Sequence, residues 1–199
     1  MTSPKRLDSF YFQAKKLRYR SRAAFKLLEL QEKFRIINEG AVLELGSSPG
    51  GWTQVIRELT EAPVLAMDMT NMRPVEGVDF IRSDMAMPEA EEKIGEWLRS
   101  RGIPGFGSVL SDAMVKTSGN RLLDHSRSVD LCEAVLKIAG IFLLPGGNVV
   151  TKMFQGEMTA GFVSKYSRLF RSSKATSVSA TREGSREIYI IFRGFIGHC

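Results

Sequence analysis

The chain has 199 residues, of which 43% are hydrophobic and 25% are charged, the balance expected of a globular domain with a sizeable core. No apolar run approaches the roughly 20 residues of a membrane helix, and the first residues lack the apolar stretch of a signal peptide. We therefore expect one cytoplasmic domain over residues 1–199, with a monomer as the default. Two cysteines and two histidines, without metal-site spacing, predict no bound metal.

The net charge of +6 is concentrated at the amino terminus. Residues 1–35 contain ten lysines and arginines against three acidic residues, a net of +7, whereas the remainder is close to neutral. Aromatic residues are interleaved with these cations at Phe10, Tyr11, Phe12, Tyr19 and Phe25. Cations bind phosphates and aromatic rings stack on bases, so we predict a basic, helical, nucleic-acid-binding extension over residues 1–35. The alternative is a solvated basic helix with its aromatic residues packed inward.

From Ser21 onward, helical and strand patterns alternate along the chain. A helix with Ser21 as its N-cap comes first. Further helices are expected at 50–60, 88–101, 123–139 and 159–170, with a turn at 143–147. Strands are expected at 41–45, 63–68, 78–81, 107–112, 148–153, 175–180 and 187–192. The alternation predicts an α/β fold with a mostly parallel seven-stranded sheet, into which the closing hairpin inserts one antiparallel strand.

A glycine-rich turn, Gly46-Ser47-Ser48-Pro49-Gly50-Gly51, joins the first predicted strand to the next helix. Open α/β sheets bind nucleotides at such turns, at the carboxyl end of a strand. Because glycine has no Cβ, we expect this backbone to approach a ligand closely.

Three predicted strands end at or just before an aspartate, namely Asp68, Asp84 and Asp112. The carboxyl ends of parallel strands share one edge of a sheet, so these carboxylates should converge beside the glycine-rich turn. Asp68 lies 22 residues after Gly46, near the spacing at which an acid binds the ribose hydroxyls of a nucleotide. The three acids together predict a bound adenosine.

The turn itself favours one class of adenosine cofactor. Ser48 stands where a dinucleotide-binding motif has its middle glycine, and no Gly-Lys-Ser/Thr is present for a triphosphate. S-adenosylmethionine has no phosphate and carries a sulfonium cation, which suits an acidic cleft. Glu44 and Asp112 would balance its positive charges, so we favour this cofactor over NAD.

Two further charged residues lie at predicted strand ends. Lys152 ends the fifth strand, beside Asp112 if the fourth and fifth strands are neighbours, and Glu187 begins the last strand. A lysine in an apolar strand is costly unless it is paired. Taken alone, each residue fits an ordinary surface charge at a strand terminus better than a functional role.

Five segments in the same order resemble the RrmJ/FtsJ (RlmE) family of RNA 2′-O-ribose methyltransferases. They are YRSRAAFKL (19–27), LGSSPGGW (45–52), SD (111–112), VVTKMFQGE (149–157) and SREIYII (185–191). The resemblance implies a Rossmann-like fold that uses S-adenosylmethionine. It also implies methylation of RNA, most often of a uridine in large-subunit (23S-type) ribosomal RNA.

The resemblance also implies a set of site residues. The family's catalytic Lys-Asp-Lys-Glu tetrad falls on Lys26, Asp112, Lys152 and Glu187. The cofactor contacts that it implies fall on Gly46, Ser48, Pro49, Gly50, Gly51, Trp52, Asp68, Asp84 and Asp112.

Two departures from the family pattern lie beside these residues. Glu44 stands where the family often has aspartate, and Ala113-Met114-Val115 replaces the usual Met-Ala-Pro after Asp112. Three alternatives remain open: 2′-O-methylation of tRNA, methylation of a small molecule, and RNA binding without catalysis. A small-molecule enzyme would leave the basic extension without a purpose, and a non-catalytic protein would not need all four tetrad residues.

Overall fold

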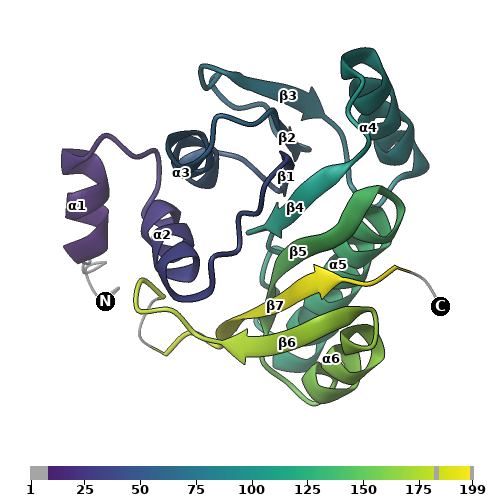
Figure 1. Cartoon of the computed structure of the whole chain (residues 1–199). Coiled ribbons are helices and arrows are strands. Elements are labelled where there is room, and N and C mark those ends of the chain that lie inside the picture. The colour runs from purple at the N-terminus through teal and green to yellow at the C-terminus, as the bar shows by residue number, and fades with distance from the viewer. Residues whose placement is uncertain (1–8, 182–183, 198–199) are drawn as a thin grey trace.

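A seven-stranded sheet forms the centre of the computed structural model, which describes residues 9–181 and 184–197 (Figure 1). Its strands are β1 (Ala41–Leu45), β2 (Val64–Asp68), β3 (Val78–Arg82), β4 (Phe106–Ser111), β5 (Leu143–Phe154), β6 (Phe170–Thr176) and β7 (Glu187–Phe195). The described helices are α1 (Ser9–Lys16), α2 (Ala23–Phe34), α3 (Gly51–Leu59), α4 (Pro88–Arg101), α5 (Arg121–Phe142) and α6 (Thr159–Ser167). Residues 1–8 of the predicted extension and Cys199 lie outside the described residues.

The strands follow the order β3-β2-β1-β4-β5-β7-β6. Every neighbouring pair from β3 to β5 is parallel, and β7 runs antiparallel to both β5 and β6. This confirms the predicted sheet with its single antiparallel strand. The chain winds outward from β1 to β3 and then resumes at β4 on the other side of β1. Open sheets of this kind bind ligands at that switch point, outside the carboxyl ends of the strands.

Helices cover both faces of the sheet (Figure 1). Helices α4, α5 and α6 pack on one face, and α2 and α3 pack on the other. Successive residues of β1 alternate between the two layers, with Leu43 in the first and Val42 in the second. All five residues of β1 are buried, as expected of a parallel strand that is covered on both sides.

The amino-terminal segment is only partly an extension. Leu27 and Leu30 of α2 are fully buried, so α2 belongs to the core. The chain before α2 crosses α3, where Gln54 accepts a hydrogen bond from the Arg20 backbone N–H and donates one to the Arg18 carbonyl. Among the described residues, α1 alone stands outside these layers, packed on α2 through Phe10 and Phe25 (Figure 1).

One predicted strand is wrong in position. The helix expected at 159–170 ends at Ser167, and β6 begins at Phe170 rather than at residue 175. Residues 177–180 instead turn over α2, where Val178 is buried and the Ser179 N–H donates to Glu29 (2.7 Å). A short apolar pattern that packs against a helix looks the same in sequence as a short strand.

Two other local predictions are corrected. The turn expected at 143–147 is instead part of β5. The register between β4 and β5 shifts in this region, so the extra residues of β5 form a bulge. Arg22, not Ser21, occupies the N-cap of α2 and makes no side-chain cap. The Ser21 hydroxyl points instead at Gly51 of the glycine-rich turn.

None of the helices within residues 9–181 and 184–197 has the length and apolar character needed to span a lipid bilayer.

Candidate active site

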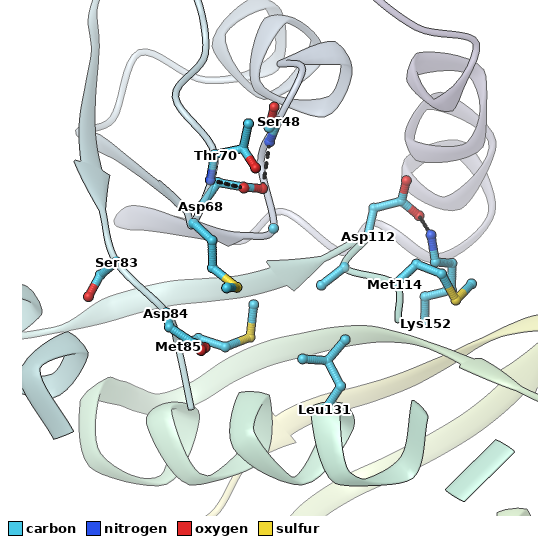
Figure 2. A pocket seen from close by; sticks show the side chains of 13 residues that line it. Ser48, Asp68, Thr70, Ser83, Asp84, Met85, Asp112, Met114, Leu131 and Lys152 are labelled. Carbon is cyan, nitrogen blue, oxygen red and sulfur yellow. Dashed lines mark hydrogen bonds and ion pairs between the residues drawn. The ribbon is translucent and has the colours of Figure 1, made fainter. Parts of the chain in front are cut away.

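A cavity of about 560 Å³ lies at the carboxyl ends of β1, β2 and β4, where the sequence predicts a ligand (Figure 2). The three strand-end aspartates all line it, so the structure brings together Asp68, Asp84 and Asp112. Its full lining is Gly46, Ser48, Asp68, Met69, Thr70, Ser83, Asp84, Met85, Asp112, Ala113, Met114, Leu131 and Lys152. A volume of this size is typical of a pocket for a small organic molecule.

Two of the aspartates hold the loops that shape this cavity. Asp68 accepts hydrogen bonds from the backbone N–H of Ser48 (2.9 Å) and of Thr70 (2.7 Å), which ties the glycine-rich turn to the loop after β2 (Figure 2). Asp84 accepts one from the Ala86 N–H (2.9 Å). Both side chains are half-buried and line the cavity, so their carboxylates are accessible to a ligand.

Apolar side chains complete the cavity and were missed by sequence reasoning. Met69 and Met85 directly follow two of the strand-end aspartates, while Met114 and Leu131 come from the next loop and from α5 (Figure 2). Such side chains suit the flat face of an aromatic base. The sequence could have indicated Met69 and Met85, because each is an apolar residue directly after a strand-end aspartate.

The glycines of the turn make room for the protein's own chain, and Gly46 also lines the large cavity. A Cβ at Gly46 would lie 2.5 Å from the Ala113 side chain, and one at Gly50 would lie 2.7 Å from the Arg20 guanidinium. One at Gly51 would collide with the Ser21 hydroxyl. Gly46 and Gly50 also have φ angles of +76° and +103°, where glycine is strongly favoured.

Trp52 is a core residue in this structure. Its indole N–H donates to the Ala23 carbonyl (2.8 Å), and its ring stacks on Tyr189 with centroids 5.8 Å apart. Only 2% of its surface is exposed. These contacts fix α2 over the sheet and thereby position Lys26, the tetrad residue that α2 contributes.

A second cavity of about 40 Å³ lies behind the turn and shares Gly46, Ser48 and Asp112 with the larger one. The predicted residues Pro49, Gly51 and Trp52 line this smaller cavity, together with Ser21, Ala23, Glu44 and Ser47. Within the described chain, the hydroxyls of Ser21 and Ser47 are buried without a hydrogen-bond partner. Gly50, by contrast, lines neither cavity and is the N-cap of α3.

Glu44 is the most buried acid of the site. Only 1% of its surface is exposed, and the Thr53 hydroxyl donates to its carboxyl group (2.6 Å). Burial, with the nearby charges of Asp112 and Asp68, raises the pKa of Glu44 to about 8. In the folded protein at pH 7 its carboxyl group is therefore mainly protonated.

The four residues of the predicted tetrad come together as two ion pairs. Lys152 Nζ lies 3.0 Å from Asp112 Oδ1, and Lys26 Nζ lies 2.7 Å from Glu187 Oε2. Both lysine side chains are nearly buried, with 6% of their surface exposed. They come from different parts of the fold: Lys26 from α2, Asp112 from the loop directly after β4, Lys152 from β5 and Glu187 from β7.

Tyr189 connects the two pairs and was also missed by sequence reasoning. Its hydroxyl donates to Asp112 Oδ1 (2.6 Å), the oxygen that Lys152 contacts, and Lys26 Nζ lies 5.8 Å from its ring centroid. Tyr189 pairs with Lys152 across β5 and β7, so both side chains lie on one face of the sheet. Burial raises the pKa of Tyr189 well above its usual value, so it remains a hydrogen-bond donor. The sequence did contain a signal for Tyr189: it lies two residues after Glu187 in a predicted strand, and so on the same face of that strand.

Comparison with known proteins gives a consistent result. A family model described as FtsJ-like methyltransferase matches residues 19–195. The ribosomal RNA large subunit methyltransferase E of Thermoplasma acidophilum is 46% identical over 191 residues, which cover 96% of this chain and 93% of that protein. The protein of the same name from Picrophilus torridus is 44% identical over 188 residues, covering 94% and 97%.

A solved structure agrees in fold. A Plasmodium falciparum protein described as a ribosomal RNA methyltransferase has a TM-score of 0.81 and 29% identity, covering 90% of this chain and all of that one. The match of the family model extends from the start of the YRSRAAFKL segment to the end of β7, and so includes all four tetrad residues. On these grounds, the chain belongs to the FtsJ-like methyltransferase family.

Proposed function

We propose that this protein transfers a methyl group from S-adenosylmethionine to a ribose 2′-hydroxyl of large-subunit ribosomal RNA. The observation that carries the proposal is the Lys152–Asp112 ion pair, which lines the same cavity as Asp68 and Asp84. A group that can orient a hydroxyl therefore lies next to a site suited to an adenosine cofactor. The names of the relatives support ribosomal RNA as the substrate.

The residues of both cavities fit S-adenosylmethionine, whose sulfonium would supply the methyl group. Asp68 and Asp84 would hold the adenosine hydroxyls and base edge, with Met85 and Leu131 against the base. The unpartnered hydroxyls of Ser21 and Ser47, beside Glu44 and Asp112, are suited to the charged amino-acid end. A dinucleotide fits less well, because Arg20 and Ser21 cover Gly50 and Gly51 at the N-terminus of α3, where its pyrophosphate would bind.

The role of the chain in the reaction is mainly to hold the target hydroxyl in line for transfer. Lys152 Nζ, fixed by Asp112, would donate a hydrogen bond that orients the 2′-oxygen. Tyr189 keeps Asp112 in place, and the Lys26–Glu187 pair forms the adjacent wall. In this proposal Lys152 is an orienting group: the 2′-oxygen would gain the methyl group as the sulfur–carbon bond breaks, and its proton would pass to solvent water.

Helix α1 is the part of the basic segment that we assign to RNA phosphates and bases. Lys15 and Lys16 are exposed, as are Tyr11 and Phe12 on the same helix. Arg20, in contrast, uses its guanidinium on the carbonyls of Pro49, Arg73 and Pro74. Lys26 and Lys33 form ion pairs within the protein. The RNA-binding prediction is thus narrowed from residues 1–35 to α1 and its flanks.

We further propose that the protein acts as a cytoplasmic monomer, because one chain supplies both ion pairs and the cavity beside them. Light scattering during size exclusion would give a mass near 22.2 kDa for a monomer.

The function is tested with tritiated S-adenosylmethionine and four separate acceptors: large ribosomal subunits, free large-subunit RNA, tRNA, and an RNA-free extract. We expect label in large-subunit RNA, within an alkali-resistant dinucleotide, because 2′-O-methylation blocks cleavage at that position. Lys152→Ala serves as the inactive control. Label confined to tRNA or to the RNA-free extract would assign a different substrate, and RNA binding without any transfer would indicate a non-catalytic relative.

A further inference from the structure

Strand β5 continues beyond its neighbour β4, and Lys152 lies in the part that overhangs. β4 pairs with β5 as far as Leu110 and Val150, whereas β7 pairs with β5 as far as Phe154. The end of β5 therefore has a strand on one side only, although its residues are buried. Buried backbone N–H and C=O groups need hydrogen-bond partners, so something else must serve the open side.

Side chains of α5 supply these partners. The Cys132 thiol donates to the Lys152 carbonyl (3.1 Å), and the Ser128 hydroxyl accepts from the Phe154 N–H (3.2 Å). A ring nitrogen of His125 bonds the Phe154 carbonyl (2.7 Å). The three side chains stand at positions i, i+3 and i+7 of the helix, and so on one face. We call His125, Ser128 and Cys132 the α5 column.

The column stands in the buried face of α5, whose other side chains are mainly hydrophobic. His125, Ser128 and Cys132 are 3%, 1% and 0% exposed. Buried polar groups destabilise a protein unless they are hydrogen-bonded, and these three are all bonded to the end of β5 or the loop after it. Burial also raises the pKa of the Cys132 thiol to about 12, so it keeps the hydrogen that it donates.

His125 holds the loop that follows β5. Its Nε2 accepts from the Met158 N–H (3.1 Å), and a Cβ at Gly156 would lie 2.5 Å from its ring. The Phe154 carbonyl can only accept a hydrogen bond and the Met158 N–H can only donate one. These partners assign the proton to Nδ1 and leave Nε2 without one.

The same end of β5 also contacts the chain that leads to Glu187. The Gln155 N–H donates to the carbonyl of Arg186, the residue before Glu187 (2.8 Å). A shift of β5 would therefore displace Lys152 and disturb the approach to Glu187 together. Of the described residues of α5, Leu131 lines the large cavity, and none of the α5 column does.

We propose that His125, Ser128 and Cys132 are positioning residues for methyl transfer, which replace the missing strand along the end of β5 and hold Lys152 against Asp112. The inference rests on the proposed function and deepens it. In-line transfer is sensitive to geometry, and a misplacement of about 1 Å can cost about 100-fold in rate. The column acts on Lys152 through the backbone and touches no substrate.

Ser128→Ala tests this directly, because it removes one oxygen and leaves the helix packed. We expect kcat for RNA methylation to fall about tenfold or more, with KM for RNA and for S-adenosylmethionine within about twofold of wild type. Cys132→Ala should also lower kcat, and Cys132→Ser, which keeps a donor, should restore most of it. Val135→Ala, in the hydrophobic part of α5, is the control: it should lower Tm while the folded protein keeps its kcat.

An unchanged kcat in Ser128→Ala, or a Cys132→Ser variant as slow as Cys132→Ala, would overturn the inference. A crystal structure of Ser128→Ala gives a readout that needs no substrate. The distance from Lys152 Nζ to Asp112 Oδ1 is 3.0 Å in the wild type, and in the variant we expect it to exceed hydrogen-bond range. If wild type methylates no RNA, the proposed function fails, and this distance alone decides whether the column positions Lys152.

Discussion

Asp112 joins the two halves of the site at the scale of single residues. Its Oδ1 contacts both the Lys152 ammonium and the Tyr189 hydroxyl, at 3.0 and 2.6 Å, while the same side chain lines both cavities. Hydrogen bonds between charged and polar groups in a poorly solvated site are strong and directional. Asp112 thus fixes the orientation of Lys152 relative to a ligand in the cavity.

Replacing Lys152 by alanine should separate binding from chemistry. We expect Lys152→Ala to bind S-adenosylmethionine with near wild-type affinity and to lose methyl transfer by roughly 100-fold or more, the cost of a misplaced nucleophile. Calorimetry measures the first quantity, and a single-turnover assay measures the second. Near wild-type turnover would remove Lys152 from the mechanism.

Glu44 should make the stability of the protein depend on pH. Its pKa is about 8 in the folded protein, against an ordinary value of 4.5. Between these values the folded state holds a proton that the unfolded state has released, so the free energy of unfolding decreases as pH rises from 4.5 to 8. The loss is on the order of 3 kcal/mol by pH 7, at about 1.4 kcal/mol for each pH unit.

Urea unfolding at pH 5, 6, 7 and 8 would measure this dependence. Glu44→Gln, which is neutral in both states, should flatten the curve and stabilise the protein at pH 8. The same slope in both proteins would mean that other groups cause it.

At the scale of elements, α1 and α2 divide the basic segment between two tasks. α2 carries Lys26 into the site and is held there by the Trp52 indole and by Leu27 and Leu30. The segment between the helices is fixed through Arg20 to the loop after β2. A truncation of residues 1–20 would therefore damage the cofactor cavity, so point substitutions on α1 are the better test of RNA binding.

The double substitution of Lys15 and Lys16 by alanine should weaken RNA binding and leave cofactor affinity unchanged. Two lost phosphate contacts should reduce the slope of log K against log salt by about 1.5. Titration of RNA at several salt concentrations gives this slope. Lys137→Ala with Lys165→Ala, two exposed cations on the opposite helical layer, is the control. An equal effect in the control would mean that only net charge matters.

At the scale of the whole molecule, a ligand at the switch point should stabilise the entire fold, because the cavities are built from β1, β2, β4 and β5 together. S-adenosylmethionine at about 100 times its Kd should raise the free energy of unfolding by about 2.7 kcal/mol. For a chain of this size the expected rise in Tm is about 5–10 °C. NAD at the same concentration should leave Tm unchanged, and an equal shift with NAD would contradict the cofactor assignment.

Much of the site could be predicted before the structure was considered. The strand-end positions of Asp68, Asp84 and Asp112 placed them on one edge of the sheet, because parallel strands share their carboxyl ends. The resemblance assigned Lys26 and Glu187 to one site, although 161 positions separate them. The match of the FtsJ-like family model confirms that resemblance.

The sequence could not predict contacts between residues that are distant along the chain, because such contacts leave no periodic pattern in it. The glycine-rich turn packs against Ala113, Arg20 and Ser21 on the side where a Cβ would project from its glycines. The predicted strand at 175–180 extends too far, because residues 177–180 turn over α2 and bury Val178 against it. In both cases the partner comes from a distant part of the chain, and local pattern carries no information about it.

The sequence by itself determined the α/β architecture and the edge of the sheet where the site lies, because hydrophobic period and strand-end residues are local properties. Only the tertiary structure decided how the lysines are held and which state Glu44 adopts. Ion-pair geometry depends on the register of β5 with β7 and on the length by which β5 overhangs β4. The pKa of Glu44 depends on burial beneath α3. Both are produced by packing between elements, which no single stretch of residues encodes.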